Sequence, residues 1–353
     1  MKRDFSRELS PEVRERMKKN LVYVGIFSVI MLFAGFTSAY IVLMGDSFWL
    51  KYPMPMFFWY STATVAISSV TFILAIRAAK QNKQLLLKTL MGTTTLLGAL
   101  FIFFQFKGYG ELIDKGFYAA NNHIMVVDGK YGSYFEVLMN NKKVDVFCND
   151  YLIDGKKMTD SEMKSLQDFT SQFLNYEQGK VMTMTNPSPS IVLLMDNRPI
   201  VVKDQKVCKP DGVLFTHLDA LRLKYFAENI RDNRGDFYAK GEIGKDFQIY
   251  YKGEELGYGK DRKLTYQGKP LSAGLETKAI EAADSASSFL YIITFIHLLH
   301  IAVAMIYLIK ITINSFSGRF NSDNHLSLRT GAMFWHFLGL LWAYLLLFLI
   351  YIH

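Results

Sequence analysis

The chain has 353 residues, of which 50% are hydrophobic and 15% aromatic, and its formal net charge is +8. The hydrophobic share is typical of a membrane protein, but 20% charged residues are too many for a chain that lies wholly within a membrane. A region outside the membrane is therefore expected. Two cysteines are too few to indicate a disulfide scaffold.

A basic segment, residues 1–20, precedes the first apolar run. Within it, Ser10, Pro11 and Glu12 predict a helix start, with serine as the N-cap and proline at the first helical position. No small-residue cleavage site follows, so we expect no cleavable signal peptide. The basic residues fit either binding to nucleic acid or anionic lipid, or a topology signal beside a membrane span. We favour the topology signal, which places this segment in the cytoplasm.

Five apolar runs are long enough to cross a membrane as helices. They lie at about 21–43, 56–76, 86–106, 287–309 and 334–352. The expected fold class is a membrane all-α protein with five transmembrane helices and an extracytoplasmic α+β domain inserted between the third and fourth helices. The predicted divisions are a cytoplasmic segment at 1–20, helices within 21–110, the insertion at 111–285 and helices within 286–353. Trp49, Tyr52 and Trp59 are expected to anchor the first connector at the membrane interface.

The distribution of charge predicts the orientation of the chain. Residues 111–285 hold about 24 basic and 26 acidic residues, so the positive excess lies in residues 1–20 and in the loops after the second and fourth runs. Basic loops stay in the cytoplasm. The insertion and the C-terminus are therefore predicted to be periplasmic, and the high net charge needs no nucleic-acid partner.

The insertion combines strand and helix patterns. Hairpin turns are predicted at the sequences NNKK and DGKK, and around Asn197 and Arg198. The sequence SEMKSLQDFTSQFL has helical spacing, with Ser161 as the expected N-cap. A second helix is predicted from the spacing of four apolar residues, Leu221, Leu223, Phe226 and Ile230.

Few residues of the insertion suggest chemistry. Cys148 and Cys208 are a candidate disulfide, which would close a loop of about 60 residues and stabilise the fold by ~4 kcal/mol. The alternative is two buried thiols. His123 and His217 are isolated in sequence and read as ordinary surface or core histidines rather than metal ligands. No phosphate-binding loop or nucleophile elbow is present in the sequence.

The apolar runs contain no Asp, Glu, Lys or Arg at depth, which argues against a pump or transporter built from this chain alone. They do contain His297, His300 and His336. His297 and His300 are three residues apart and so lie on one helical face. They could ligate haem or a metal ion, but we favour hydrogen bonding to neighbouring helices or lipid headgroups.

The last two runs resemble subunit III of the haem–copper oxidases. The fourth run resembles the pattern S-x-F-x-x-x-T-G-x-H-G-x-H through Ser288, Thr294, His297 and His300. The fifth run resembles W-H-F-x-D-x-x-W through Trp335, His336, Phe337 and Trp342. Weaker similarities follow in order in FSVIMLFAG, in AISSVTFILA and in FFQFKGY, the last through Gln105 and Tyr109.

The sequence also departs from the family pattern. Val29, Gly108 and Gly339 stand where the family motifs have acids, and Phe295 and Leu298 replace signature glycines. The large insertion also differs from the short connection of the family. The missing acids argue against a role of this chain in proton collection.

The resemblance implies a non-catalytic accessory subunit of a respiratory cytochrome c oxidase, in the short five-helix form, in a bacterial inner membrane. In such a complex, this chain would carry no haem or copper, which belong to the partner subunits. It would pack against subunit I, beside subunit II, and bind phospholipids. The signature positions for this packing are His297, His300, Trp335, His336, Trp342 and Gln105.

Alternatives remain open from the sequence. The same family serves quinol oxidases and an accessory chain of nitric oxide reductase. A protein of another class, a membrane assembly or insertion factor with a periplasmic client-binding domain, would also have several spans and a large outer domain. The insertion at 111–285 is expected either to contact another respiratory complex or a donor cytochrome, or only to shield subunit I.

Overall fold

The computed structural model describes residues 11–120, 123–124, 126–127, 129–131, 135–147, 149–235, 241–322 and 324–352. The chain divides into two compact units. The helical unit comprises Met1–Leu43, Met54–Glu111 and Phe289–His353. The inserted unit comprises Met44–Pro53 and Leu112–Ser288. Each unit is described by itself.

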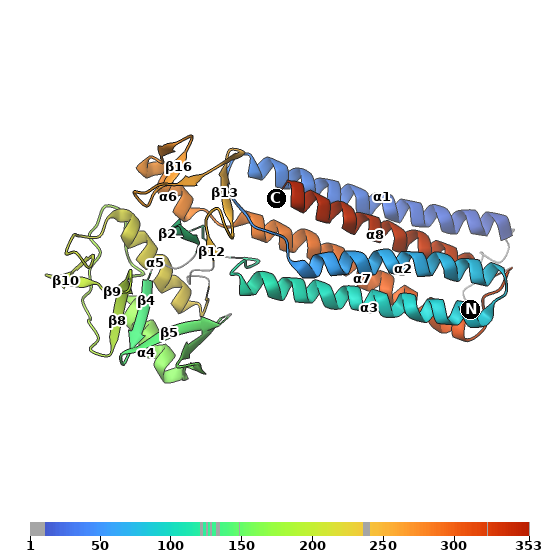
Figure 1. Cartoon of the computed structure of the whole chain (residues 1–353), viewed down its shortest axis with the longest axis horizontal. Helices are drawn as coiled ribbons and strands as arrows, with labels where there is room; N and C mark the ends of the chain where they lie inside the picture. The colour runs from blue at the N-terminus through green and yellow to red at the C-terminus, as the bar shows by residue number, and fades with distance from the viewer. Residues whose placement is uncertain are drawn as a thin grey trace, which may run out of the picture. The chain divides into compact units, whose positions relative to one another are not determined.

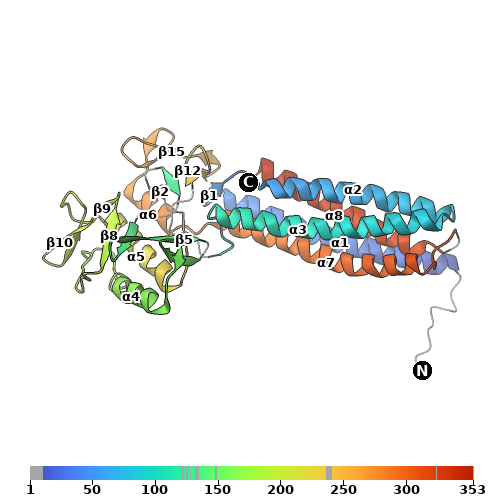
Figure 2. The same cartoon turned by 60° about the horizontal axis from the view of Figure 1, so that its bottom comes forward.

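Five long helices run side by side in the helical unit (Figures 1 and 2). They are α1 (Pro11–Met44), α2 (Met56–Lys80), α3 (Gln84–Asp114), α7 (Ser285–Phe316) and α8 (Leu326–Tyr351). All five are long and apolar enough to cross a membrane. The predicted runs are confirmed as helices, and each helix extends beyond the apolar run into flanking polar sequence. Helix α1 is helical from Pro11, the first described residue, so the predicted start at Ser10 and Pro11 remains a prediction.

The outer faces of these helices are apolar. Leu21, Leu96 and Ile306 are 74%, 70% and 71% exposed, respectively, although they lie within long helices. Such faces would be costly in water, whereas lipid tails cover them without loss. The chain is therefore a multi-pass membrane protein.

Hydroxyl groups tie the helices together on their inner faces. The Thr71 and Thr94 hydroxyls are 2.8 Å apart and join α2 to α3. The Thr95 and Thr312 hydroxyls, 2.7 Å apart, join α3 to α7. Within lipid, such interhelical hydrogen bonds replace the hydrophobic driving force that packs helices in water.

The inserted unit is built on a six-stranded antiparallel sheet in the order β7-β6-β5-β4-β8-β9. The strands are β4 (Phe135–Met139), β5 (Lys142–Phe147), β6 (Asp150–Ile153), β7 (Lys156–Lys157), β8 (Ile191–Met195) and β9 (Arg198–Pro199). Helices α4 (Asp160–Ser171) and α5 (His217–Arg231) lie next to this sheet in both views (Figures 1 and 2). Inward residues of the strands, such as Phe135 and Leu193, share one apolar core with Leu166, Leu223 and Phe226 of the helices.

Smaller elements complete the inserted unit. They are β1 (Phe48–Lys51), β2 (Val126–Val127), β3 (Lys130–Tyr131), β10 (Val201–Lys203), β11 (Lys206–Cys208), β12 (Gly241–Glu242), β13 (Gln248–Tyr251), β14 (Glu254–Glu255), β15 (Gly257–Tyr258), β16 (Leu264–Tyr266), β17 (Lys269–Pro270) and α6 (Ala273–Glu281). These strands form a β10-β11 hairpin and three small sheets, β1-β13-β14, β12-β3-β2 and β15-β16-β17. The expectation of an inserted strand-rich α+β region between the third and fourth long helices is confirmed.

The predicted hairpins are largely correct. The NNKK turn connects β4 to β5 through Asn140 and Asn141, which have φ angles of 52° and 64°. Asparagine tolerates this left-handed conformation better than most residues, which is why the pattern marks a two-residue turn. The turn predicted around Asn197 and Arg198 lies at Asp196 and Asn197, one residue earlier, and connects β8 to β9.

The predicted helices of the insertion are confirmed, but one cap is wrong. Thr159, rather than Ser161, caps α4, because Thr159 and Glu162 form a reciprocal capping box. Ser161 lies inside the first turn of α4. In α5, the four apolar residues whose spacing predicts the helix, Leu221, Leu223, Phe226 and Ile230, are all buried.

The connector between α1 and α2 is part of the inserted unit. Its strand β1 pairs with β13, with Phe48 opposite Tyr251 and Leu50 opposite Ile249. Trp49 is 1% exposed, and Tyr52 stacks on Phe117 with ring centroids 3.8 Å apart. The expectation that Trp49 and Tyr52 are interfacial anchors is wrong, because strand pairing places Trp49 in the inserted unit and the stack on Phe117 covers Tyr52. Trp59 is 49% exposed, as an anchor requires.

Candidate functional site

The signature residues of the last two helices meet at His297. This histidine of α7 is fully buried, and its Nε2 lies 3.0 Å from the carbonyl oxygen of Leu338 on α8. A carbonyl oxygen only accepts, so Nε2 carries the proton and donates it. The imidazole also stacks on Trp342, with ring centroids 5.4 Å apart and an interplanar angle of 28°. His297 of α7 thus contacts α8 through both a hydrogen bond and a ring stack.

The two signature tryptophans join α8 to α2. Trp342 Nε1 donates to Thr62 Oγ1 at 2.9 Å, and Trp335 Nε1 donates to Ser68 Oγ at 2.9 Å. Both indoles are almost completely buried. A Cβ added at Gly98 of α3 would lie 2.8 Å from the Trp335 ring, so glycine is needed for this ring to reach the interior.

Helix α3 enters the same layer through two polar residues. Gln105 Nε2 donates to Ser61 Oγ of α2 at 2.8 Å. Tyr109 donates its hydroxyl proton to Thr294 Oγ1 of α7 at 3.0 Å. Thr294 is itself a signature position, so matched residues from the third and fourth spans contact each other directly.

Aromatic rings fill the space between these polar groups. Phe101 of α3 packs edge-on against both His297 and Trp342, with centroids 6.1 and 5.7 Å away. Phe33 of α1 packs edge-on against His297 at 6.3 Å. Edge-to-face pairs at these distances stabilise by about 0.5–1.5 kcal/mol each beyond their area burial. All five helices therefore contribute to one layer centred on His297.

The other two histidines lie at the margin of this layer. His300 is half-buried, and its Nδ1 bonds to the Ile296 carbonyl of its own helix at 2.8 Å. His336 is half-buried beside Phe72, with ring centroids 6.1 Å apart. Among the described residues, no group of three or more His, Cys, Asp or Glu is placed to hold a metal ion.

The missing acids leave two different environments. At Gly108, a Cβ would lie 2.6 Å from Cδ1 of Phe58, because this fully buried ring fills the space beside the glycine. At Gly339, a Cβ would lie 3.3 Å from Cγ2 of Val65 and 3.6 Å from Ser69 Oγ. Val29 is buried, as an apolar packing residue would be. An aromatic ring therefore occupies one acid site, whereas another retains room for a small side chain.

The candidate residues of the inserted unit remain separate. Cys208 is buried, and Cys148 lies outside the described residues, so the disulfide remains a prediction. His123 stacks on Tyr225 with centroids 4.1 Å apart. Burial first, then Arg234, lowers the pKa of His123, and Glu281 partly opposes this shift. His217 Nδ1 lies 2.9 Å from the Tyr176 hydroxyl.

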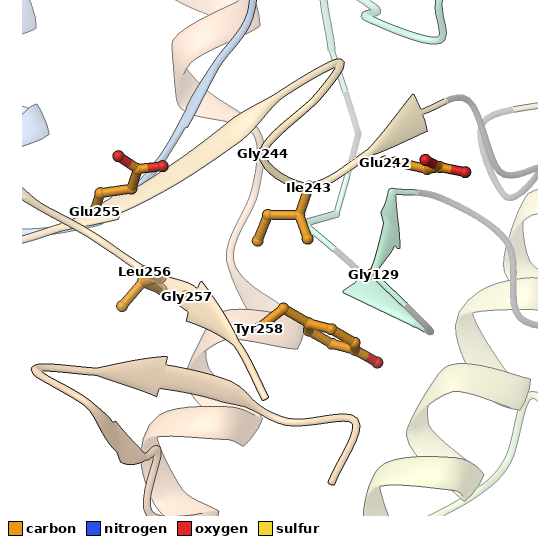
Figure 3. A pocket seen from close by; sticks show the side chains of 8 residues that line it. All are labelled: Gly129, Glu242, Ile243, Gly244, Glu255, Leu256, Gly257 and Tyr258. Carbon is orange, nitrogen blue, oxygen red and sulfur yellow. The ribbon is translucent and has the colours of Figure 1, made fainter. Parts of the chain in front are cut away.

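A separate cavity of about 420 Å³ opens in the inserted unit (Figure 3). Ile243, Leu256 and Tyr258 supply its apolar lining, and Glu242 and Glu255 lie on opposite sides of it. No sequence motif indicates this cavity, because its walls come from three short, separate segments.

Sequence reasoning also missed the acceptors of the buried donors. Thr62 lies outside every motif, and Ser68 belongs to the sequence AISSVTFILA, whose similarity to the family is weak. A buried indole N–H usually finds a hydrogen-bond partner, so the two tryptophans predict acceptors without identifying them. The arrangement as a whole is a buried aromatic layer in which hydrogen bonds between helices hold them at fixed spacing.

Comparison with known proteins agrees with this geometry. Residues 276–353, which include the whole of α7 and α8, match the family model of cytochrome c oxidase subunit III. No curated protein matches the chain, and no solved structure does. The resemblance of the last two spans is confirmed: the C-terminal region of this membrane protein is a cytochrome c oxidase subunit III region.

Proposed function

We propose that this chain is the accessory subunit III of a respiratory haem–copper terminal oxidase, a complex that couples oxygen reduction to proton translocation. In this role, the chain stabilises the catalytic subunit and binds phospholipid. Haem and copper belong to the partner subunits I and II, and this chain carries no catalytic centre.

The observation that carries the proposal is the buried layer around His297. The family match covers α7 and α8, yet the layer continues into α2 and α3 through Trp342, Trp335 and Tyr109. The weaker motif similarities of the earlier spans thus contact the matched region physically. A shared packing layer supports one subunit III bundle rather than an unrelated protein in which only the last two helices resemble the family.

The proposed setting follows from the distribution of charge. We place the chain in a bacterial inner membrane with the N-terminus in the cytoplasm, and with residues 111–285 and the C-terminus in the periplasm. Basic residues at both cytoplasmic loops and at the N-terminus support this orientation. Single cysteines introduced at Lys83 and Lys260, labelled with a membrane-impermeant reagent in intact cells, test it: label should reach position 260 only.

Purification of the tagged full chain in a mild detergent tests the function. We expect haem-bearing chains to copurify, with a reduced-minus-oxidised haem spectrum and oxygen uptake in the same fraction. Uptake driven by cytochrome c supports the oxidase named here, whereas uptake driven only by quinol, or nitric oxide consumption, assigns the chain to a sister complex. A haem-free preparation that brings down varied membrane proteins would favour an assembly factor and overturn the proposal.

The insertion is proposed to dock an electron-donor protein or a neighbouring respiratory complex. Deleting it is a poor test, because Phe48, Trp49 and Leu50 of the α1–α2 connector are buried in the same unit and would become exposed. Charge reversal at exposed positions spares the buried core, and the surface ion pair of Lys157 with Asp150 that it removes contributes little stability. Lys156→Glu and Lys157→Glu on the edge strand β7 should weaken donor-driven oxygen uptake if this edge docks a partner, while uptake from an artificial donor stays constant.

A further inference from the structure

The cavity of the inserted unit has the size of a ligand site. Its volume of about 420 Å³ falls within the roughly 300–1,000 Å³ that small-molecule sites occupy. Its walls come from the β2–β3 turn, from β12 and the residues after it, and from β14 and β15 (Figure 3). All of these segments belong to the inserted unit, so the cavity needs no second unit to be complete.

Glycine keeps the cavity open on one side. Gly129 has a φ of +74°, a conformation that residues with side chains rarely adopt. A Cβ there would lie 3.5 Å from both Ile243 Cγ2 and Tyr258 Cδ1, directly against the apolar lining. The turn therefore exposes the Ile243 and Tyr258 side chains to the cavity instead of covering them. Leu256, 1% exposed, adds a rigid apolar base.

The charge of the lining is entirely negative. The ionisable acids or bases among the described lining residues are Glu242 and Glu255. Glu242 has cationic neighbours, since Lys245 Nζ lies 3.7 Å from its carboxylate and Lys130 stands opposite it in the strand pairing. Glu255 makes no ion pair with any described residue. Among the described residues, Glu255 therefore has weaker compensation of its charge than Glu242.

We propose that this cavity binds a cationic group on an apolar stem, an ammonium or guanidinium, with Glu255 as the residue that recognises the charge. The methylene stem packs on Ile243 and the Tyr258 ring, which Leu256 supports from behind, and the cation pairs with the Glu255 carboxylate. A carboxylate or phosphate ligand would instead meet two negative side chains. A lysine or arginine side chain of a partner protein and a free amine share this chemistry.

Binding of Nα-acetyl-lysine amide to the detergent-solubilised full chain, followed by saturation-transfer NMR, tests the site. The uncharged isostere Nα-acetyl-norleucine amide is the reference ligand. We expect the lysine derivative to bind about fivefold more tightly, the preference that one exposed ion pair provides. Glu255→Gln should remove this preference. Glu254→Gln is the matched control, because its carboxylate bonds to Gln267 at 3.0–3.1 Å and does not line the cavity.

Two results would overturn the site. One is equal binding of the lysine and norleucine derivatives to the unmodified chain, and the other is an equal loss of preference in the two variants. Competition between cadaverine and the end-blocked peptide Ala-Ala-Lys-Ala-Ala then distinguishes a free amine from a protein side chain as the ligand. A stronger effect of the peptide identifies a protein side chain, and a stronger effect of cadaverine identifies a free amine. The cavity and its ligand do not depend on the oxidase role proposed above.

Discussion

The contact between Gly108 and Phe58 allows the packing of the helical unit to be tested by adding a single methyl group. An alanine at position 108 would place its Cβ 2.6 Å from Cδ1 of a ring that is fully buried and cannot swing away. An alanine at position 339 would meet Val65 Cγ2 at 3.3 Å, which a shift of a few tenths of an ångström relieves. The two substitutions add the same methyl group to helix interiors.

The expected energies differ because only one site is overpacked. Replacing a helical glycine by alanine gains about 1 kcal/mol of helix propensity at either position. Overpacking a tight interior costs about 1–3 kcal/mol, and we assign this cost to Gly108→Ala alone. Gly339→Ala should therefore stabilise the chain slightly or leave it unchanged, and Gly108→Ala should be less stable than Gly339→Ala by about 1–3 kcal/mol.

Unfolding of the full chain by sodium dodecyl sulfate from mixed micelles measures both variants. The double variant Gly108→Ala with Phe58→Leu should recover at least about 1 kcal/mol of coupling energy, because the smaller side chain makes room for the methyl group. If Gly108→Ala matches Gly339→Ala in stability, or if the Phe58 variant gives no coupling, Phe58 does not fill the acid position and the packing described here is wrong.

Three further predictions address other parts of the chain. Trp335→Phe and Ser68→Ala should each cost about 0.5–1.5 kcal/mol and show coupling near 0.6 kcal/mol in a double-mutant cycle, whereas independent effects would mean that the 2.9 Å hydrogen bond contributes nothing. Trp49→Ala should cost about 3–5 kcal/mol and speed limited proteolysis of the inserted unit, while Lys51→Ala should not; equal rates would show that β1 is dispensable. Burial lowers the pKa of His123, so the unfolded chain takes up a proton near pH 6.5 that the folded chain resists, and stability should fall below pH 6.5 but less in His123→Gln; parallel pH profiles of protease resistance would refute this.

The spans and the C-terminal region could be predicted from the sequence because their signals are local. About twenty apolar residues specify a spanning helix wherever they occur. The signature positions His297, Trp335 and Trp342 repeat a pattern whose spacing lies within single helices. All three side chains are buried, and a buried indole usually finds a hydrogen-bond partner.

The tertiary partners could not be predicted, because they depend on distant segments. Strand β1 has four residues, and its pairing with β13 joins positions about 200 residues apart. Nothing in the sequence near Trp49 distinguishes a tryptophan buried in a sheet from one at a membrane interface. The cap of α4 was a smaller error of the same kind: Thr159 and Ser161 both suit an N-cap, and only the reciprocal bond to Glu162 decides between them.

The pattern of replaced acids argues for a structural role of the helical unit. A carboxyl group in lipid is costly, and those that do occur there usually serve proton or ion movement. Loss of the group alone would leave a void beside Gly108, and a void costs stability as well. Phe58 fills that space and packs edge-on against Trp342, with ring centroids 5.4 Å apart. The acid position has thus become part of the aromatic layer around His297. A bundle that kept the acid for chemistry would have to keep the space around it polar, whereas this bundle uses the space to join α2, α3 and α8.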